Sequence, residues 1–246
     1  MNTIKTWMVD VDNALGGGLV SRGNLLIAYD KRSLGWMLGL KMFKSLIEHG
    51  AVGVVLNTVA SVSKLELRLE RVGLDMRKAG EEGSLYVIDL FGSKYGIRSK
   101  APYILQIADW NEDTGIAKLI ALYRKLGRKI PKGSIVVGLV ATMEGLYHEF
   151  GEKIMKALIR SSFASFEQEP LSEYELMTIS LLNEGAIPDQ LGAWLFSIND
   201  QVVEFISYVD SEGSEEIVLF PKSVLPGFSP SHCKIKTSEK RTIELF

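Results

Sequence analysis

The sequence predicts an α/β protein built as a three-layer sandwich, with a mostly parallel sheet covered by helices and antiparallel edge strands toward the C-terminus. Short apolar runs rich in Val, Ile and Leu alternate with amphipathic stretches of helical period through residues 25–163. After Pro170 the sequence becomes strand-rich. No repeat and no linker rich in Pro, Gly or Ser interrupts the 246 residues, so we expect residues 1–246 to form a single domain.

Composition narrows the class of protein. Hydrophobic residues make up 46%, charged residues 24%, and the mean hydropathy is +0.12, as in a globular protein with a sizeable core. The net charge of -2 implies no bulk attraction to nucleic acid. Cys233 has no internal disulfide partner, and no apolar leader opens the sequence, so we expect a cytoplasmic protein. The apolar region 25–47 carries five charged residues, which argues against a membrane span.

The first half of the chain predicts strands and helices in strict alternation. We expect strands at residues 25–28, 52–56 and 85–90, and helices at about 33–48 and 64–72. Gly50 and Gly73 follow the two helices as stop signals. The strand at 52–56 is β-branched and uncharged, as a strand buried on both faces should be. Residues 1–23 form a lead-in segment before the first of these strands.

The second half continues the alternation and then changes to strands. We expect a short strand at 104–107, a helix capped by Thr114 that ends at Gly127, a strand at 135–140 and a helix at 149–163. The later strands are predicted at residues 176–182, 193–198, 202–208, 217–220 and 234–237. Residues 221–246 are expected to supply the C-terminal edge strands and a tail.

A glycine-rich segment carries a family resemblance. Gly16-Gly17-Gly18 and Arg22-Gly23 precede the strand at 25–28, and this segment resembles the entry to the ATP-binding core of RecA-like ATPases of the KaiC group. Segments 49–55, 69–75 and 85–89 are similar to the family's following elements. The resemblance extends to archaeal KaiC-like proteins. It implies a RecA-like fold for the chain, with the closest similarity in the first 90 residues.

The expected phosphate-binding loop departs from the family at four positions. Such a loop needs two glycines, so that backbone N–H groups wrap the phosphates, a Lys for the β/γ oxygens and a Ser or Thr for Mg²⁺. Aligned without gaps, this chain has Tyr29 and Leu34 at the glycines, Gly35 at the Lys and Trp36 at the Ser or Thr. A degenerate loop of this kind predicts no ATP hydrolysis, no bound metal and no cofactor.

Two further parts of the family's catalytic site are also missing from the sequence. The resemblance places an activating Glu just after the second strand, where this chain has Val59 and Ala60. It places a Mg²⁺-associated Asp at the end of a later strand, and the matching segment 135–139 has no Asp. Asp89 imitates that pattern, but by chain order it belongs to the preceding strand, where we interpret it as a turn or cap residue.

Asp30 suggests what replaces the phosphate. A helix N-terminus presents unpaired N–H donors and a partial positive charge. If the helix begins near Lys31, Asp30 is the N-cap of that helix. The Asp30 carboxylate then accepts hydrogen bonds from the unpaired N–H groups and stabilises the helix by about 1 kcal/mol. In this hypothesis Trp36 fills the volume of the nucleotide. The alternative is an ordinary capped helix with Trp36 in the core, and both interpretations predict no ATP binding.

Other candidate sites have simpler structural explanations. The three histidines, His49, His148 and His232, are too far apart for metal-ligand spacing, and His232 with Cys233 is interpreted as a surface pair. Glu144, Glu149 and Glu152 surround His148, but helix starts attract carboxylates, so we favour capping over acid–base chemistry. A basic tail contains Lys234, Lys236, Lys240 and Arg241. The alternation of its lysines is typical of an exposed edge strand rather than of a nucleic-acid site.

The sequence therefore predicts a non-catalytic RecA-like module that binds a protein or peptide, or other copies of itself, as a scaffold or regulator. Trp7 and Met8, in segment 1–11, resemble a docking segment that adds to a neighbour's sheet. The alternative is that Trp7 covers the domain's own core. A second hypothesis, from another class, is an atypical nucleotide-binding ATPase whose phosphate contacts are Lys31, Arg32 and Ser33. An accessory role in DNA repair would rest on family analogy alone.

Overall fold

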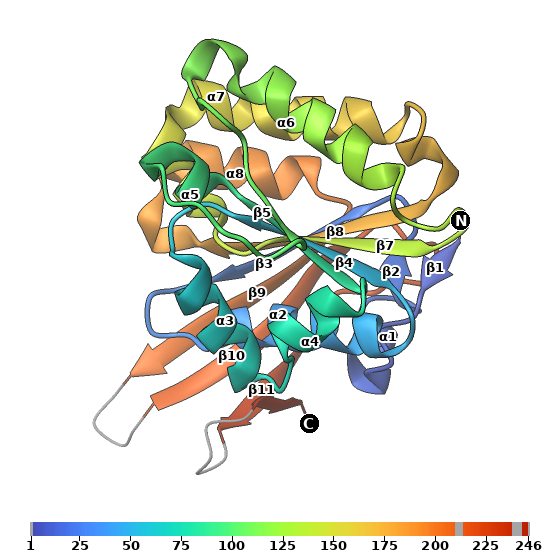
Figure 1. The fold of residues 1–246 in the computed structure, drawn as a ribbon. Helices are drawn as coiled ribbons and strands as arrows, with labels where there is room; N and C mark the ends of the chain where they lie inside the picture. The colour runs from blue at the N-terminus through green and yellow to red at the C-terminus, as the bar shows by residue number, and fades with distance from the viewer. Residues whose placement is uncertain (1, 210–213, 238–242, 246) are drawn as a thin grey trace. The chain divides into compact units, whose positions relative to one another are not determined.

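The computed structural model describes residues 2–209, 214–237 and 243–245 (Figure 1). The chain divides into two compact units. Met1–Leu46 and Met177–Phe246 form one unit, which we call the terminal unit. Ile47–Leu176 forms the other, which we call the central unit. Each unit is described by itself below.

The terminal unit contains a small two-stranded sheet and a larger mixed sheet. Its elements are β1 (Thr3–Ile4), α1 (Val9–Ala14), β2 (Leu19–Val20), β3 (Asn24–Tyr29), α2 (Gly35–Glu48), β8 (Glu175–Asn183), the 3-10 turn η2 (Glu184–Ala186), α8 (Asp189–Ile198), β9 (Gln201–Val209), β10 (Ser214–Ser223), β11 (Ser231–Thr237) and β12 (Ile243–Leu245). Strands β1 and β2 pair with each other in antiparallel orientation. In the larger sheet β3 lies between β8 and β9 and runs parallel to both.

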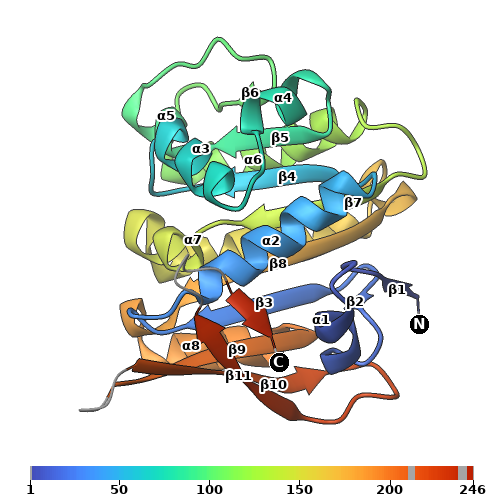
Figure 2. The same cartoon turned by 90° about the horizontal axis from the view of Figure 1, so that it is seen from below.

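Antiparallel strands complete the larger sheet in the order β9, β10, β11 and β12 (Figure 2). Helix α2 packs closely on β3 and β8, because a Cβ atom at Gly39 would lie 2.3 Å from Leu181 and 3.1 Å from Ile27. Helix α8 lies on the opposite face (Figure 1). The core between these layers includes the fully buried side chains of Phe43, Phe205 and Phe220.

The central unit is a parallel sheet with helices on both faces. Its elements are β4 (Val52–Asn57), α3 (Val62–Arg71), α4 (Met76–Glu81), β5 (Leu85–Asp89), α5 (Leu90–Tyr95), β6 (Ile104–Leu105), α6 (Glu112–Gly127), β7 (Ile135–Val140), α7 (Met143–Phe166) and the 3-10 turn η1 (Leu171–Glu173). The strand order is β7, β4, β5, β6, all parallel. Helices α6 and α7 cover one face, and α3 and α4 lie on the other (Figure 1).

The predicted α/β class is confirmed, with mostly parallel strands and antiparallel strands toward the C-terminus. Strand β4, which we expected to be buried on both faces, has all six residues buried. The predicted strands at 25–28, 85–90 and 135–140 correspond to β3, β5 and β7. None of the helices in the described part of the chain is long and apolar enough to cross a membrane.

The strand predicted at 193–198 is wrong, because these residues form the second half of helix α8. An apolar run of six residues fits a strand and a buried helix equally well. The helix is indicated instead by the spacing of Leu191 and Leu195, which are both buried and lie one turn apart. Pro188 immediately precedes the helix as its N-cap.

Three local expectations are also corrected. Thr114 is not the cap of α6, because Asn111 is the N-cap and its side chain accepts a hydrogen bond from the Thr114 N–H. Strand β11 is not an edge strand, since β12 pairs with its outer side, while Lys234 forms an exposed ion pair with Glu215. Lys240 and Arg241 lie outside the described residues. Helix α7 begins at Met143 rather than at Glu149.

A kink at Gly151 divides α7. This residue has φ 77° and ψ 164°, a backbone conformation that residues with a Cβ atom rarely adopt. No atom lies within 4 Å of a Cβ built at Gly151, so backbone strain is the only obstacle to a side chain there.

We therefore expect Gly151→Ala to lower the free energy of unfolding by about 1–3 kcal/mol, measured by denaturant titration. Gly185→Ala is the matched control, because Gly185 has no positive φ and its nearest neighbour is 3.5 Å from the added carbon. The control is expected to change stability by less than about 1 kcal/mol. Equal effects of the two substitutions would contradict strain at Gly151.

Candidate functional site

The loop between β3 and α2, residues 30–34, is folded around the carboxylate of Asp30. One oxygen, Oδ1, accepts hydrogen bonds from the backbone N–H groups of Arg32 at 2.7 Å and Ser33 at 3.1 Å. The other, Oδ2, accepts one from the N–H of Ser207 in β9 at 2.7 Å. Asp30 therefore closes the loop and ties it to the neighbouring strand of the terminal unit.

A second carboxylate reaches the same loop from β10. Glu216 Oε1 accepts a hydrogen bond from the Leu34 N–H at 3.2 Å, and the Ser33 hydroxyl also bonds to Glu216. Ser33 Oγ in turn accepts the N–H of Gly35 at 2.8 Å. The backbone N–H groups of residues 32–35 are thus each bound by a side-chain oxygen of the protein itself. These are the groups that would face a phosphate in a phosphate-binding loop.

Gly35 is packed too tightly to carry a side chain. A Cβ atom at this position would lie 2.7 Å from the ring of Phe205 in β9 and 3.0 Å from Cβ of Tyr29. Tyr29 is buried and Trp36 is half-buried. The family resemblance assigns a Lys to the position of Gly35. In this protein the ring of Phe205 fills the space that such a side chain would need.

The charges around the loop are mostly negative. Partial burial raises the pKa of Asp30, but the hydrogen bonds from Arg32, Ser207 and Ser33 lower it more, so its pKa lies below the ordinary value. Burial raises the pKa of Glu216, and the charge of Asp30 adds to that rise. Glu184 lies close enough to Asp30 and Glu204 for their charges to repel. Four carboxylates thus share this end of the terminal unit's sheet.

The structure corrects how Asp30 acts. Helix α2 begins at Gly35 rather than near Lys31, so Asp30 is not its N-cap. Its carboxylate binds loop N–H groups two and three residues ahead, as Asp does in turns. Lys31 and Arg32 are exposed, whereas Ser33 is buried and its side chain is used inside the loop. The three proposed phosphate contacts therefore do not converge as one set.

In the central unit Asp89 is the N-cap of α5, which confirms its interpretation as a cap residue. Its Oδ1 accepts hydrogen bonds from the Gly92 N–H at 3.0 Å and the Asn57 side chain at 2.9 Å, and its Oδ2 accepts one from Gln106 at 2.8 Å. Asp89 is 2% exposed, and both of its carboxylate oxygens accept hydrogen bonds from within the protein. Nearby Ala60 accepts a hydrogen bond from Asn57 through its backbone oxygen.

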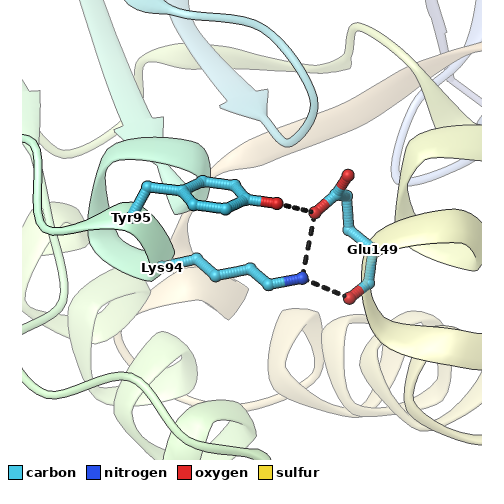
Figure 3. A network of polar contacts seen from close by, with 3 residues as sticks. All are labelled: Lys94, Tyr95 and Glu149. Atoms are coloured by element: carbon cyan, nitrogen blue, oxygen red, sulfur yellow. Dashed lines mark hydrogen bonds and ion pairs between the residues drawn. The ribbon is translucent and has the colours of Figure 1, made fainter.

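Two of the carboxylates near His148, Glu149 and Glu152, form ion pairs with lysines. Lys94 of α5 donates to Glu149 Oε2 at 2.9 Å and to the Glu149 backbone oxygen at 2.8 Å, and Tyr95 donates to the same Oε2 at 2.9 Å (Figure 3). Glu152 pairs with Lys156 at 2.6 Å. The ring of His148 is exposed and packs edge-on against Tyr147. The contacts of Glu149 fasten α5 to α7.

At the N-terminus a small polar network holds Trp7 outward. Asp12 Oδ1 accepts hydrogen bonds from the Thr6 N–H at 2.9 Å and the Thr6 hydroxyl at 2.8 Å, and both residues are buried. Between them Trp7 is 58% exposed and has φ 62°, a strained value for a residue with a side chain. Met8 is half-buried and Val9 is 71% exposed. The chain therefore presents apolar surface at a fixed turn.

Sequence reasoning found Asp30 but missed Glu216 and Phe205, which lie about 175–185 residues further along the chain. The single available signal was that Glu216 stands directly before the apolar run from Ile217 to Phe220. Over residues 2–209, 214–237 and 243–245, no three His, Cys, Asp or Glu side chains are grouped in a way that could hold a metal ion.

Because the pKa of Glu216 is raised in the folded protein, its negative charge destabilises the fold at neutral pH. A group whose pKa is higher in the folded protein stabilises it below the ordinary Glu value of 4.5 and loses that stabilisation as pH rises. Glu216→Gln keeps an oxygen for the Leu34 N–H and removes the charge. We expect the substitution to raise Tm at pH 7 and to give no gain at pH 4, measured by calorimetry. A lower Tm at pH 7 would contradict this.

The pKa of Glu149 is shifted in the opposite direction to that of Glu216. The hydrogen bond from Lys94 lowers its pKa, against a smaller rise from burial. Its charge therefore stabilises the fold above the ordinary value of 4.5, and this contribution disappears as pH falls. We expect Glu149→Gln to lower the free energy of unfolding by about 1 kcal/mol or less at pH 7. Urea titrations from pH 3 to pH 7 measure the difference, and its persistence at pH 3 would refute the assignment.

Comparison with known proteins supports the fold. No family model matches the chain, and no curated protein matches it by sequence. Among solved structures, the uncharacterized protein PH0321 from Pyrococcus horikoshii, crystallised in complex with an unknown peptide, has a TM-score of 0.83 at 17% identity. The match covers 99% of this chain and 100% of that one.

A second solved structure is the KaiC-like protein PH0186 from Pyrococcus horikoshii OT3, a hyperthermophilic archaeon. It has a TM-score of 0.73 at 15% identity and covers 100% of this chain and 99% of that one. Both matches extend over the whole chain, including the antiparallel strands that follow the parallel ones. The protein therefore has the RecA-like fold of KaiC-like proteins.

Proposed function

We propose that this chain is a non-catalytic RecA-like module that binds a protein or peptide, and that its loop after β3 is closed to nucleotides. One observation carries the proposal. The backbone N–H groups of residues 32–35 already bind the side chains of Asp30, Glu216 and Ser33. A phosphate would have to displace these oxygens before it could bind the loop.

Displacement is opposed by electrostatics as well as by hydrogen bonding. The triphosphate of ATP would enter next to the carboxylates of Asp30, Glu184, Glu204 and Glu216, and like charges in a partly buried site repel strongly. A carboxylate pushed away from its N–H donors would also lose charge-assisted hydrogen bonds. The ring of Phe205 against Gly35 leaves no room for the lysine that normally offsets phosphate charge.

A binding role fits the surface near the N-terminus. Trp is enriched among the residues that dominate protein–protein binding energy. Trp7 is held at a strained positive φ by the buried pair Thr6 and Asp12, and such strain is often kept where a side chain must be presented. We therefore assign Trp7 and Met8 to a contact with a protein, a peptide or a second copy of the chain. The peptide found with PH0321 is in keeping with this role.

The competing function is nucleotide binding through Lys31 and Arg32. Both side chains are exposed beside the loop and could meet phosphates from outside without opening it. This arrangement would need no displacement of Asp30. The two functions make different predictions. If Lys31 and Arg32 bind a nucleotide, any nucleotide-dependent property is lost when these two side chains are removed.

Titration calorimetry with ATP and Mg²⁺ tests the proposal. We expect no heat of binding at about 1 mM nucleotide, which corresponds to a free energy weaker than about -4 kcal/mol. Native mass spectrometry of the purified protein should show no retained nucleotide. Binding in the micromolar range would refute the closed loop. If Lys31→Ala with Arg32→Ala then abolished it, the external nucleotide site would replace the proposal.

A further inference from the structure

Helix α6 has a second apolar face that the fold does not cover. In the sequence Ile116, Leu119, Ile120 and Tyr123 recur at the helical interval. In the structure Leu119 is 1% exposed, whereas Ile116 and Ile120 are only half-buried and line a groove of about 670 Å³ together with Ser161 of α7. Helices α6 and α7 lie side by side in the central unit (Figure 1).

The groove residues of α6 form two stripes at intervals of four residues. One stripe contains Ile116, Ile120 and Arg124, and the other contains Ala117, Ala121 and Lys125. Residues four apart lie on the same face of a helix, so each stripe changes from apolar to basic in the same direction. The two alanines are exposed and short, which lets a partner's backbone approach closely.

The basic end of the groove has no acidic partner among the residues that the structure describes. Arg124 donates to the neutral side-chain oxygen of Gln168, and Arg128 extends the basic end by one turn. Within the described residues, no carboxylate forms an ion pair with Arg124, Lys125 or Arg128. Asp113 lines the opposite end. The groove is therefore positive at the C-terminal end of α6 and negative at its N-terminal end.

We propose that this groove, between α6 and α7, binds an amphipathic helix of a partner protein whose N-terminal turns are acidic. The partner's apolar side chains lie over Ile116, Ile120 and the two alanines, and its carboxylates face Arg124, Lys125 and Arg128. An amphipathic helix in a groove between two helices is a common mode of peptide recognition. The inference rests on the proposed protein-binding role and names the chemistry of one partner.

Charge fixes the direction of the bound helix. Acidic residues are favourable in the first turn of a helix, where they complement its dipole. With that turn beside the basic end, the partner runs antiparallel to α6, and basic residues in its last turn meet Asp113. Residues 113–128 span about 22 Å along the helix axis, so a partner of about 15 residues fills the groove.

The apolar floor favours a peptide over a nucleic acid. Single-stranded nucleic acids bind on aromatic side chains that stack with the bases. The lining side chains of this groove are aliphatic or small between its charged ends. They suit the leucine or isoleucine side chains of a helix.

A designed peptide tests the inference by fluorescence anisotropy with the full chain. The probe is a labelled 16-residue amphipathic helix with leucines at positions i, i+3, i+4 and i+7, glutamates in the first turns and lysines in the last. We expect a Kd of about 10–100 µM, as for a small, partly polar interface. The same peptide with glutamates last and lysines first is expected to bind at least about tenfold more weakly, since its charges oppose the groove.

Two variants locate the site. Lys125→Glu with Arg128→Glu reverses the basic end and is expected to weaken binding at least about tenfold. Arg77→Glu with Lys78→Glu changes charge equally on exposed residues of α4 and should leave the Kd within about twofold. Ala117→Gln with Ala121→Gln fills the groove without a charge and should also abolish binding. Circular dichroism melting curves confirm that each variant folds.

Binding that is absent, or equally affected by the α4 control, would overturn the inference. It would also be overturned if single-stranded RNA bound through Lys125 and Arg128 while the peptide did not. These failures are distinguishable from failure of the proposed function. Peptide binding leaves the loop after β3 untouched, whereas nucleotide binding is read from calorimetry with ATP.

Discussion

The carboxylate of Asp30 is the interaction on which the terminal unit's loop depends. It accepts hydrogen bonds from two N–H groups of its own loop and from the N–H of Ser207 in the neighbouring strand β9. Without this acceptor, the part-buried N–H groups of Ser33 and Ser207 would lose their partner, and an unpaired buried donor costs about 1–3 kcal/mol. The start of α2 at Gly35, the burial of Ser33 and the approach of Glu216 all follow from the loop conformation that Asp30 fixes.

Strand register explains why such distant residues meet at this loop. In the parallel pairing of β3 with β9, Tyr29 lies opposite Phe205. Ser207 is two residues further along β9 and therefore points to the same face as Phe205, toward the loop. In the antiparallel pairing of β9 with β10, Ser207 lies opposite Glu216. A shift of one residue in either register would turn Phe205 or Glu216 to the other face of the sheet and open the loop.

The sequence could predict what depends on local patterns. The parallel strands were predictable because β4 and β7 are short, β-branched runs bounded by polar residues, and Asp30 was recognisable as a carboxylate before a helix. Its role as an N-cap was wrong because the helix begins four residues later, which local propensity does not determine. Phe205 and Glu216 were not predictable, since their role depends on the register of strands far apart in the sequence. The apolar run in α8 was ambiguous even locally. Six residues are too few for hydrophobic periodicity to distinguish a helix from a strand.

Helix α6 shows that the sequence also does not determine which part of an apolar helix face stays exposed. Its pattern correctly indicates an amphipathic helix, but an apolar stripe in a sequence does not reveal how much of it the fold covers. Leu119 and Leu126 face the core, and the packing of α7 leaves Ile116 and Ile120 half-exposed. Arg124 and Lys125 lie in the last turn of α6, where basic side chains also complement the dipole of the helix itself. What favours docking is that the basic residues continue the same two stripes as the half-buried and exposed apolar residues, because a partner on those stripes gains direction from the charged end.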